Sequence, residues 1–176
     1  MIQFKLTSTK DELKEIIELQ QRNLPNSISL EEQQNQGFVT VQHTLGVLEK
    51  MHKAHPHVVA THNNKVIGYA LCMLKEFKNV VPVLIPMFDQ IDKELSINYI
   101  VMGQVCINKN YRKKGVFRGL YNYMQENISK KYNAIITEVD IKNVRSSEAH
   151  KAIGFKTLKE YHSNNQNWEL IILPTK

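Results

Sequence analysis

The fold is decided by the stretch GQVCINKNYRKKGVFRGLYNYMQEN, which runs from Gly103 to Asn127. Its first part holds the apolar run Val105–Ile107, whose β-branched residues and following turn formers predict a buried strand. Its second part has an apolar residue at every fourth position, and this spacing puts one apolar stripe on a helix. The stripe consists of Val116, Leu120, Met124 and, just beyond the quoted stretch, Ile128. The stretch therefore predicts a strand, a turn and a helix in that order.

The turn between this strand and this helix is strongly basic. Cations surround Gly115 with no carboxylate among them, namely Lys109, Arg112, Lys113, Lys114 and Arg118. The first backbone N–H groups of a helix have no partner within the helix, and together with the helix dipole they favour an anion. We therefore expect a site for a diphosphate at the start of this helix. The alternative is a solvated basic loop ahead of an ordinary amphipathic helix. The turn matches neither the P-loop nor the dinucleotide-binding pattern.

The hexapeptide Arg112-Lys113-Lys114-Gly115-Val116-Phe117 resembles the pyrophosphate loop Q/R-x-x-G-x-G/A of the GNAT superfamily of acyl-CoA-dependent N-acetyltransferases. Its last residue, Phe117, stands where the family usually has glycine or alanine. Further along, the segment from Asn143 to Phe155 has the family's asparagine at the start of a helix, then His150, and a closing Gly-Phe at the family's spacing. The two motifs and the strand between them carry the resemblance. The N-terminal half agrees with the family only in its order of elements.

The resemblance implies an α/β fold, a mixed central sheet of about seven strands flanked by helices on both faces, with splayed central parallel strands. The length of 176 residues, with 42% of them hydrophobic, suits a single domain over residues 1–176. We expect residues 1–99 to form the acceptor side and residues 100–176 to bind acetyl-CoA. Up to residue 100 there are ten Lys or Arg against eleven Asp or Glu, and beyond it thirteen against six. This excess favours a phosphorylated ligand in the second half.

The resemblance also implies which residues hold acetyl-CoA. The backbone of Val105 and Ile107 would pair with the pantetheine arm like an added strand, and the N–H groups of residues 113–118 would bind the diphosphate. Arg145 or Lys151 would reach the adenosine phosphate as screened surface charges. The residues assigned to the cofactor are Val105, Cys106, Ile107, Arg112, Lys113, Lys114, Gly115, Val116, Phe117, Arg118, Asn143, Ser146 and His150.

The implied reaction is attack of a neutral amine on a thioester, which needs a base for the ammonium and an acid for the leaving thiolate. His150 stands where the family commonly has a tyrosine that protonates the sulfur, and a packing role is its alternative. Gln104 stands about where many members have a glutamate, and an amide cannot accept the proton. Glu138 on the next strand is the first substitute, with a structural hydrogen-bond acceptor as its alternative. Asp89 and His43 are weaker substitutes.

Three functions are compatible with these features. The first is an acetyltransferase that acts on a primary amine of a small molecule or a peptide. The second is a CoA-binding or regulatory module without turnover, which Gln104 and Phe117 favour. The third is a nucleic-acid-binding face made by the basic half and its tyrosines, but no nucleic-acid motif accompanies them, so we expect no such partner. The resemblance is compatible with a homodimer, since family members are frequently dimers.

The cysteines, the histidines and the N-terminus indicate the compartment of the protein and whether it binds a metal. Cys72 and Cys106 lie in apolar strand-like runs, which favours reduced core residues and a reducing compartment. The N-terminus lacks a signal-peptide pattern and no apolar run is long enough to span a bilayer, so we expect a cytoplasmic protein without a membrane partner. A proline and a helix end interrupt His52, His55 and His57, so we expect these histidines to cap a helix and no metal to bind.

The rest of the chain supplies the remaining elements. Capping boxes at Thr9 and Ser29 each predict a helix, the second closed by Gly37, and residues 37–43 would form the loop nearest the acceptor cleft. The turn Asn63-Asn64 predicts a hairpin. The expected strands are 2–7, 58–61, 65–74, 134–139, 155–161 and 168–173, with further helices at 44–54 and after Asn143. The predicted order is β-α-α-α-β-β-β-α-β-α-β-β.

One segment does not fit this order. The insert from Val80 to Ser96 separates two predicted strands and is rich in proline and apolar residues. A segment of this length is often a binding loop, and a helical plug that covers the sheet is the alternative.

Overall fold

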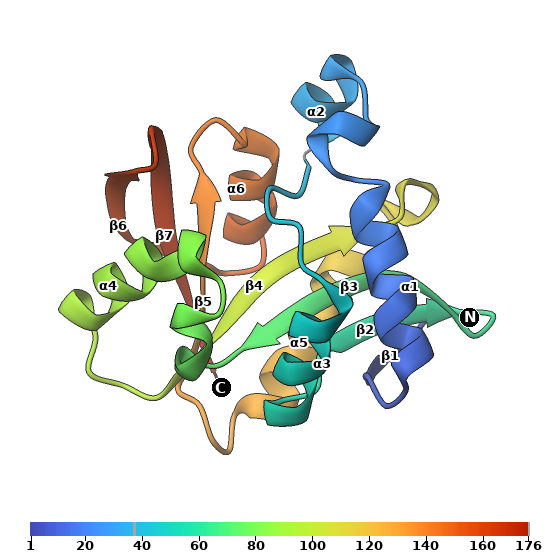
Figure 1. The fold of residues 1–176 in the computed structure, drawn as a ribbon, viewed down its shortest axis with the longest axis horizontal. Helices are drawn as coiled ribbons and strands as arrows, with labels where there is room; N and C mark the ends of the chain where they lie inside the picture. The colour runs from blue at the N-terminus through green and yellow to red at the C-terminus, as the bar shows by residue number, and fades with distance from the viewer. Residues whose placement is uncertain (37, 176) are drawn as a thin grey trace.

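A computed structural model describes residues 1–36 and 38–175 of the chain. Its centre is a sheet in the order β1-β2-β3-β4-β5-β7-β6 (Figure 1). The β4–β5 pair is parallel and all other neighbours are antiparallel, which confirms the predicted mixed sheet. The strands are β1 (Gln3–Leu6), β2 (Val58–His62), β3 (Lys65–Met73), β4 (Tyr99–Ile107), β5 (Ala134–Asp140), β6 (Lys156–Ser163) and β7 (Gln166–Pro174).

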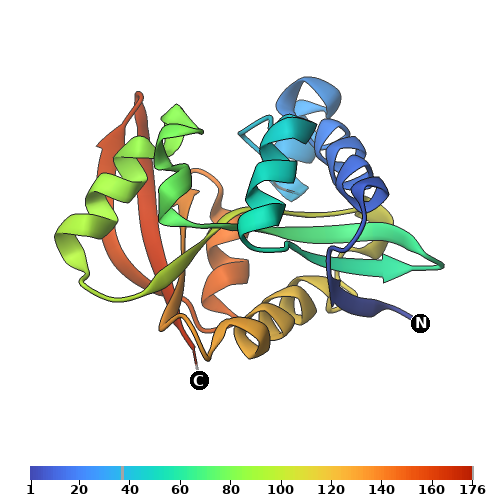
Figure 2. The same cartoon turned by 60° about the horizontal axis from the view of Figure 1, so that its bottom comes forward.

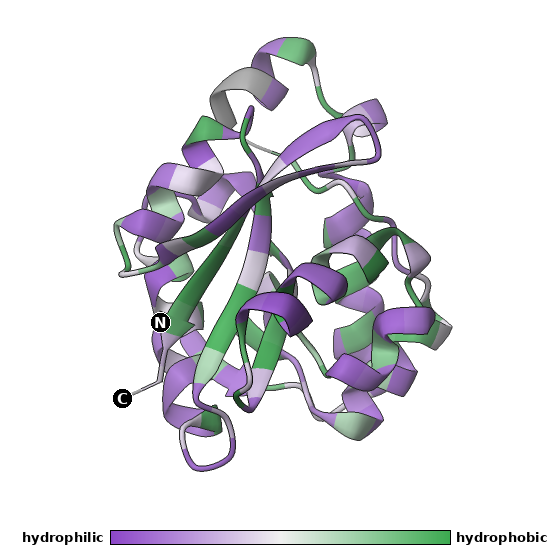
Figure 3. Cartoon of the chain, turned by 90° about the vertical axis from the view of Figure 1, so that its left-hand side faces the viewer, coloured by the Kyte–Doolittle hydropathy of each residue, from purple (hydrophilic) through white to green (hydrophobic). Residues whose placement is uncertain are grey.

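Helices cover both faces of this sheet (Figure 2). On one face, α1, α3 and α4 bury their apolar stripes against the strands, and on the other face α5 does the same. Hydrophobic residues accordingly concentrate on the central strands (Figure 3), whereas the edge strand β6 is mostly hydrophilic. The helices are α1 (Lys10–Gln21), α2 (Leu30–Gln36), α3 (Leu45–Ala54), α4 (Ile85–Glu94), α5 (Val116–Ile128) and α6 (Val144–Lys151). No helix in the described part of the chain is long and apolar enough to cross a bilayer.

The two central parallel strands separate along their length. The β4–β5 ladder runs only from the pair Tyr99–Ala134 to the pair Val101–Ile136. On its other side β4 stays paired with β3 as far as Ile107. The second half of β4 therefore presents one edge of its backbone toward a gap instead of toward β5, and unpaired backbone groups of this kind seek a partner.

Local signals account for the connections. Thr9 and Glu12 form the predicted capping box, and the Ser29 hydroxyl accepts a hydrogen bond from the Glu32 backbone at 3.1 Å. Gly37, predicted to close α2, lies outside the described residues. Asn63 and its neighbour take the left-handed conformation in the β2–β3 turn, as the hairpin prediction requires, because asparagine tolerates that region.

The insert is helical, so the predicted order of elements was wrong in omitting a helix between β3 and β4. Pro82 and Pro86 lie in the first turns of helical segments, where a missing N–H costs nothing, and they therefore start these helices instead of breaking them. Met87, Phe88 and Ile91 of α4 are buried against the sheet. The helical plug is thus the form that the insert takes.

The clustered histidines serve packing in several places. His52 Nδ1 lies 2.8 Å from the Thr7 hydroxyl, and His55 Nδ1 lies 2.8 Å from a neighbouring carbonyl. The buried His57 accepts a hydrogen bond from the Cys72 backbone at 3.1 Å. Among the described residues, no group of three or more His, Cys, Asp or Glu side chains is placed to hold a metal. The thiols of Cys72 and Cys106 are both free and buried.

Candidate active site

The basic turn places a helix N-terminus beside the splayed end of β4. Gly115 caps α5 with φ of 76°, and Lys113 also takes the left-handed region with φ of 60°. A Cβ on Gly115 would meet no atom within 4 Å, so conformation and not crowding calls for glycine here. The first hydrogen bond within the helix joins the Gly119 N–H to the Gly115 carbonyl. The N–H groups of residues 116–118 are therefore available to an anion.

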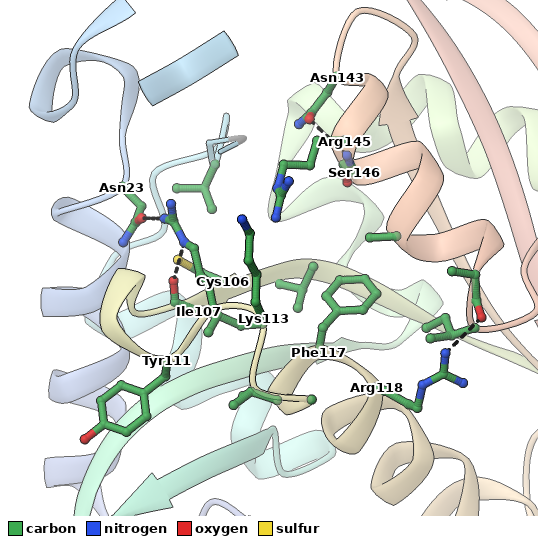
Figure 4. A pocket seen from close by; sticks show the side chains of 18 of the residues that line it. Asn23, Cys106, Ile107, Tyr111, Lys113, Phe117, Arg118, Asn143, Arg145 and Ser146 are labelled. Atoms are coloured by element: carbon green, nitrogen blue, oxygen red, sulfur yellow. Dashed lines mark hydrogen bonds between the residues drawn. The ribbon is translucent and has the colours of Figure 1, made fainter. Parts of the chain in front are cut away.

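A cavity of about 350 Å³ lies between this turn, β4 and α6 (Figure 4). Among the residues predicted to hold the cofactor, Lys114, His150 and Lys151 do not line it, and Lys151 pairs with Glu169 at 3.0 Å. Those that do are Val105, Cys106, Ile107, Arg112, Lys113, Gly115, Val116, Phe117, Arg118, Asn143 and Ser146. The structure thus brings two sequence motifs, separated by a strand and a helix, around one space.

Two cations reach into this cavity without an ion pair among the described residues. Lys113 extends from the basic turn and Arg145 from the first turn of α6 (Figure 4). Lys114 and Arg118 of the same turn have partners in the fold. Lys114 Nζ lies 5.4 Å from the centre of the Tyr111 ring, and Arg118 donates to the Ala152 carbonyl at 3.2 Å. Lys113 and Arg145 are therefore the side chains best placed to meet phosphate oxygens.

Arg112 supports the cavity wall. Its Nη2 donates to Asn23 Oδ1 at 2.6 Å and its Nε donates to the Ile107 carbonyl at 3.2 Å. Its Nη1 is buried, lies 3.7 Å from Glu32 and has no hydrogen-bond partner within the protein. The guanidinium thus fixes the end of β4 to the end of α1.

The helix α6 begins at the far wall of the cavity. The Asn143 side chain accepts a hydrogen bond from the Ser146 N–H at 3.2 Å and so caps this helix. Both residues line the cavity. The asparagine of the second motif therefore has a structural task and still faces the space where a ligand would lie.

His150 lies behind this wall and is 1% exposed. Its Nδ1 donates to the Ser146 carbonyl at 2.7 Å, so its Nε2 is the acceptor for the Tyr121 hydroxyl, also at 2.7 Å. The Phe117 ring, which takes the family's glycine or alanine position, packs on the imidazole at 5.0 Å. Burial lowers the pKa of His150 to about 4. The imidazole is thus neutral near pH 7 and covered on its cavity side by Phe117.

A smaller second cavity, of about 150 Å³, lies at the other end of the gap between β4 and β5. Glu138 of β5 lines it and accepts a hydrogen bond from the Tyr161 hydroxyl of β6. Burial raises the pKa of Glu138 to about 7, and the Tyr161 hydrogen bond offsets part of that rise. A carboxyl with this pKa can take up a proton near neutral pH.

Gln104 fixes the loop that separates the two cavities. Its Oε1 accepts a hydrogen bond from the Tyr69 hydroxyl, and its Nε2 donates to the Val41 carbonyl, both at 2.6 Å. Phe38 and the next residue line the larger cavity, whereas Thr40 and Val41 line the smaller one. The amide that replaces the usual glutamate therefore holds the common wall in place. Residues 38–41 thus line both cavities.

The weaker candidates for the base lie elsewhere. Asp89 pairs with Lys78 on the outer side of α4. His43 is buried, burial lowers its pKa to about 4, and its Nε2 has no hydrogen-bond partner within the protein. Neither side chain lines the two cavities. Glu138 is thus the candidate that the fold brings to the gap.

Several residues at the site were not predicted from the sequence. Asn23 and Tyr161 reach the site through contacts with Arg112 and Glu138, far away in sequence, and no local pattern marks them. Trp168 lines the smaller cavity because of the register of β7 on β5. Sequence spacing along a single element does not contain this information.

The N–H groups of residues 116–118 at the start of α5 form an anion cradle. This cradle and the splayed sheet together define the class of fold that the two motifs indicated. The chain matches the sequence model of the acetyltransferase (GNAT) family over residues 13–155. It therefore belongs to the GNAT family. A search of curated protein sequences gave no match.

Solved structures agree on the fold. The ribosomal-protein-S18-alanine N-acetyltransferase from Escherichia coli is 12% identical, with a TM-score of 0.67 over 99% of this chain and 94% of that one. The NatC complex bound to Gag peptide and CoA includes a chain 15% identical, with a TM-score of 0.70 over 99% of both chains. A putative acetyltransferase from Salmonella typhimurium, solved with acetyl-CoA, is 14% identical, with a TM-score of 0.68 over 100% of this chain and 95% of that one.

Proposed function

We propose that this protein is an N-acetyltransferase that transfers an acetyl group from acetyl-CoA to a primary amine by direct attack in a ternary complex. The observation that carries the proposal is the pair of cavities at the two ends of the β4–β5 gap. One has an anion cradle and the other has a carboxyl with a pKa near 7. Two substrates can therefore approach one gap from opposite sides.

The larger cavity fits acetyl-CoA. The N–H groups at the start of α5, together with Lys113 and Arg145, would bind the diphosphate or the adenosine phosphate. Arg112 would hold the wall of this cavity in place through Asn23 and the Ile107 carbonyl. The free edge of β4 at Val105 and Ile107 would take the pantetheine amides, as an added strand does. The substrate acetyl-CoA supplies the thioester.

The smaller cavity would hold the acceptor amine beside Glu138. The ionised carboxylate takes one proton from the ammonium, which leaves a neutral nucleophile. As the amine nitrogen bonds to the acetyl carbon, the C–S bond breaks and the nitrogen loses its second proton. The thiolate takes up one proton, so the products are the amide, free CoA and one net proton. The neighbour solved with a peptide and CoA supports a peptide terminus among the acceptors.

The direct acid role of His150 stays a prediction, and its surroundings favour an indirect role. Only a small fraction of a group with a pKa of about 4 carries an extra proton at pH 7. His150 instead holds the first turn of α6 through the Ser146 carbonyl, and Ser146 faces the cavity. It would thus position the residues that contact the cofactor.

A CoA-binding module without turnover is the second candidate. Position 104 holds an amide whose oxygen and nitrogen are both engaged in hydrogen bonds, so this position supplies no carboxylate to act as the base. Release of free CoA from acetyl-CoA across an amine panel separates the two functions. The enzyme predicts amine-dependent release, lost by about a hundredfold or more in Glu138→Gln, with initial rates that fit a ternary complex. If the protein is a module without turnover, it should bind acetyl-CoA and show no amine-dependent release of CoA.

A further inference from the structure

We propose that the acceptor is a primary amine that carries one compact, uncharged apolar group, and that the α4 insert makes this selection. The inference rests on the proposed function for the reaction and adds the chemical class of the substrate. It covers two sources with the same chemistry, a free monoamine and the first residue of a peptide. The argument comes from the walls of the smaller cavity.

The insert supplies the roof of this cavity. Val83 and Leu84 line it from the 3-10 turn just before α4, and Met87 lines it from α4 itself, together with Met102 of β4. Trp168 of β7 closes another side. Large apolar side chains thus surround the place where the substituent of the amine would lie, and burying an apolar group against them is favourable.

The charges of the insert point elsewhere. Asp89 pairs with Lys78, and Asp92 pairs with Lys75 at 2.6 Å. Lys159 of β6 pairs with Glu94 at 2.6 Å, which ties the end of α4 to the edge hairpin. The helix therefore turns its apolar side to the cavity and its ionic side outward.

Among the described residues that line the smaller cavity, Glu138 is the one that carries an ionisable side chain. The uncharged polar residues beside it are Thr40, Thr137 and Gln166. A second ammonium on the substrate would find no second carboxylate there, and a substrate carboxylate would find no cation. An unpaired charge in such a space is costly, so the second charge of a diamine or an acidic amine weakens its binding.

Size sets the other limit. A cavity of about 150 Å³ holds a molecule of roughly the size of benzene. A straight or branched chain of about five carbons, or one ring, fits this space. Val83 is 48% exposed at the rim, so the cavity opens toward solvent beside the insert. A peptide chain beyond the first residue would leave by this side.

The chain offers a direct probe of binding, because Trp168 is its single tryptophan and lines the cavity. Tryptophan emission is recorded while pentylamine or cadaverine is added to the protein saturated with CoA. The two amines share the same carbon chain and differ by one ammonium group. We expect a saturable change with pentylamine and at least about tenfold weaker binding of cadaverine.

Turnover gives the second measurement, with kcat/KM for pentylamine, cadaverine and phenethylamine, and for short peptides that begin with leucine or aspartate. We expect pentylamine to exceed cadaverine, and leucine to exceed aspartate, by at least about tenfold. Whether the free amines or the peptides react faster identifies the source of the substrate.

A matched pair of variants tests the insert. Val83→Ala removes two methyl groups from the cavity wall and should raise kcat/KM for phenethylamine relative to pentylamine by about tenfold. Val80→Ala makes the same change on the same insert at a residue that is 40% exposed and outside the lining, and it should leave the ratio unchanged.

The outcomes separate the two proposals. Equal binding or turnover of cadaverine and pentylamine would overturn the apolar class, and so would an absence of saturable binding for every apolar amine. A ratio that does not move in Val83→Ala would overturn the role of the insert. Saturable binding of pentylamine without release of CoA from acetyl-CoA would instead refute the proposed transferase and leave the ligand class standing.

Discussion

Replacing Glu138 by glutamine should make the protein more stable at pH 8 and a much poorer catalyst. Burial raises the pKa of this carboxyl from 4.5 to about 7 in the folded protein. The difference corresponds to a cost of roughly 3 kcal/mol for keeping the carboxylate ionised in the fold above pH 7. Because the folded pKa is raised, the contribution of this carboxyl to stability is complete below about pH 4.5 and is lost as the pH rises through about 7.

The Glu138→Gln variant removes this cost and keeps an oxygen for the Tyr161 hydroxyl. The gain in the free energy of unfolding should therefore be small at pH 5, increase up to pH 7 and stay at roughly 3 kcal/mol at pH 8. Urea denaturation at these pH values measures it. Glu160→Gln, at the exposed neighbour of Tyr161 on β6, serves as the control and should show no such rise.

The same carboxyl should govern the rate. In the unmodified protein, kcat/KM should rise with pH to a plateau above about 7, and Tyr161→Phe should move that plateau to higher pH, because the lost hydrogen bond favoured the carboxylate. The reasoning is refuted if Glu138→Gln retains the full rate, or if its gain in stability is the same at pH 5 and pH 8.

Three further predictions concern the cradle and the core. Gly115→Ala should cost about 1–2 kcal/mol in the free energy of unfolding, because alanine resists the left-handed region, and should weaken CoA binding in calorimetry. Gly46→Ala, in α3 with equal space for a Cβ, should be neutral or stabilising; equal effects on stability would contradict the backbone argument. His150→Phe should cost about 1–3 kcal/mol by leaving the Tyr121 hydroxyl unpaired, and adding Tyr121→Phe should recover part of that stability. Recovery of activity in this double variant would exclude the direct acid role. Finally, burial lowers the pKa of His57 to about 3 and those of His43 and His150 to about 4, so the stability that these neutral imidazoles contribute is complete above about pH 6.5 and falls, for each of them, by about 1.4 kcal/mol per pH unit toward its folded value. Urea denaturation of the Glu138→Gln variant at pH values from 7 to 5 should show this loss. An unchanged free energy of unfolding over this range would refute the prediction.

The sequence predicts the fold well where local signals agree. Apolar spacing marks α5, Thr9 marks the start of α1, and Asn63 marks the first hairpin. The insert was harder, because prolines are found both in loops and in the first turn of a helix. Only the packing of Met87 and its neighbours against the sheet settles the choice. Burial is a property of the whole chain, so a local pattern cannot contain it.

The candidate site was predictable in the part that consists of contiguous motifs. Residues 112–118, except Lys114, gather with Asn143 and Ser146 at one cavity because each motif begins a helix at the same edge of the sheet. The partners of these residues were not predictable, since Tyr161 meets Glu138 across a ladder of strands. The burial of His150 behind Phe117 likewise depends on how two helices pack.

The central claim is that the β4–β5 gap joins a diphosphate cradle to an amine-binding cavity. A crystal structure of the protein with acetyl-CoA tests it most directly. The account predicts the diphosphate on the N–H groups of residues 113–118, the pantetheine along Val105 and Ile107, and the acetyl group at the gap that leads to Glu138. Acetyl-CoA bound elsewhere, or with its acetyl group directed away from Glu138, would contradict the account.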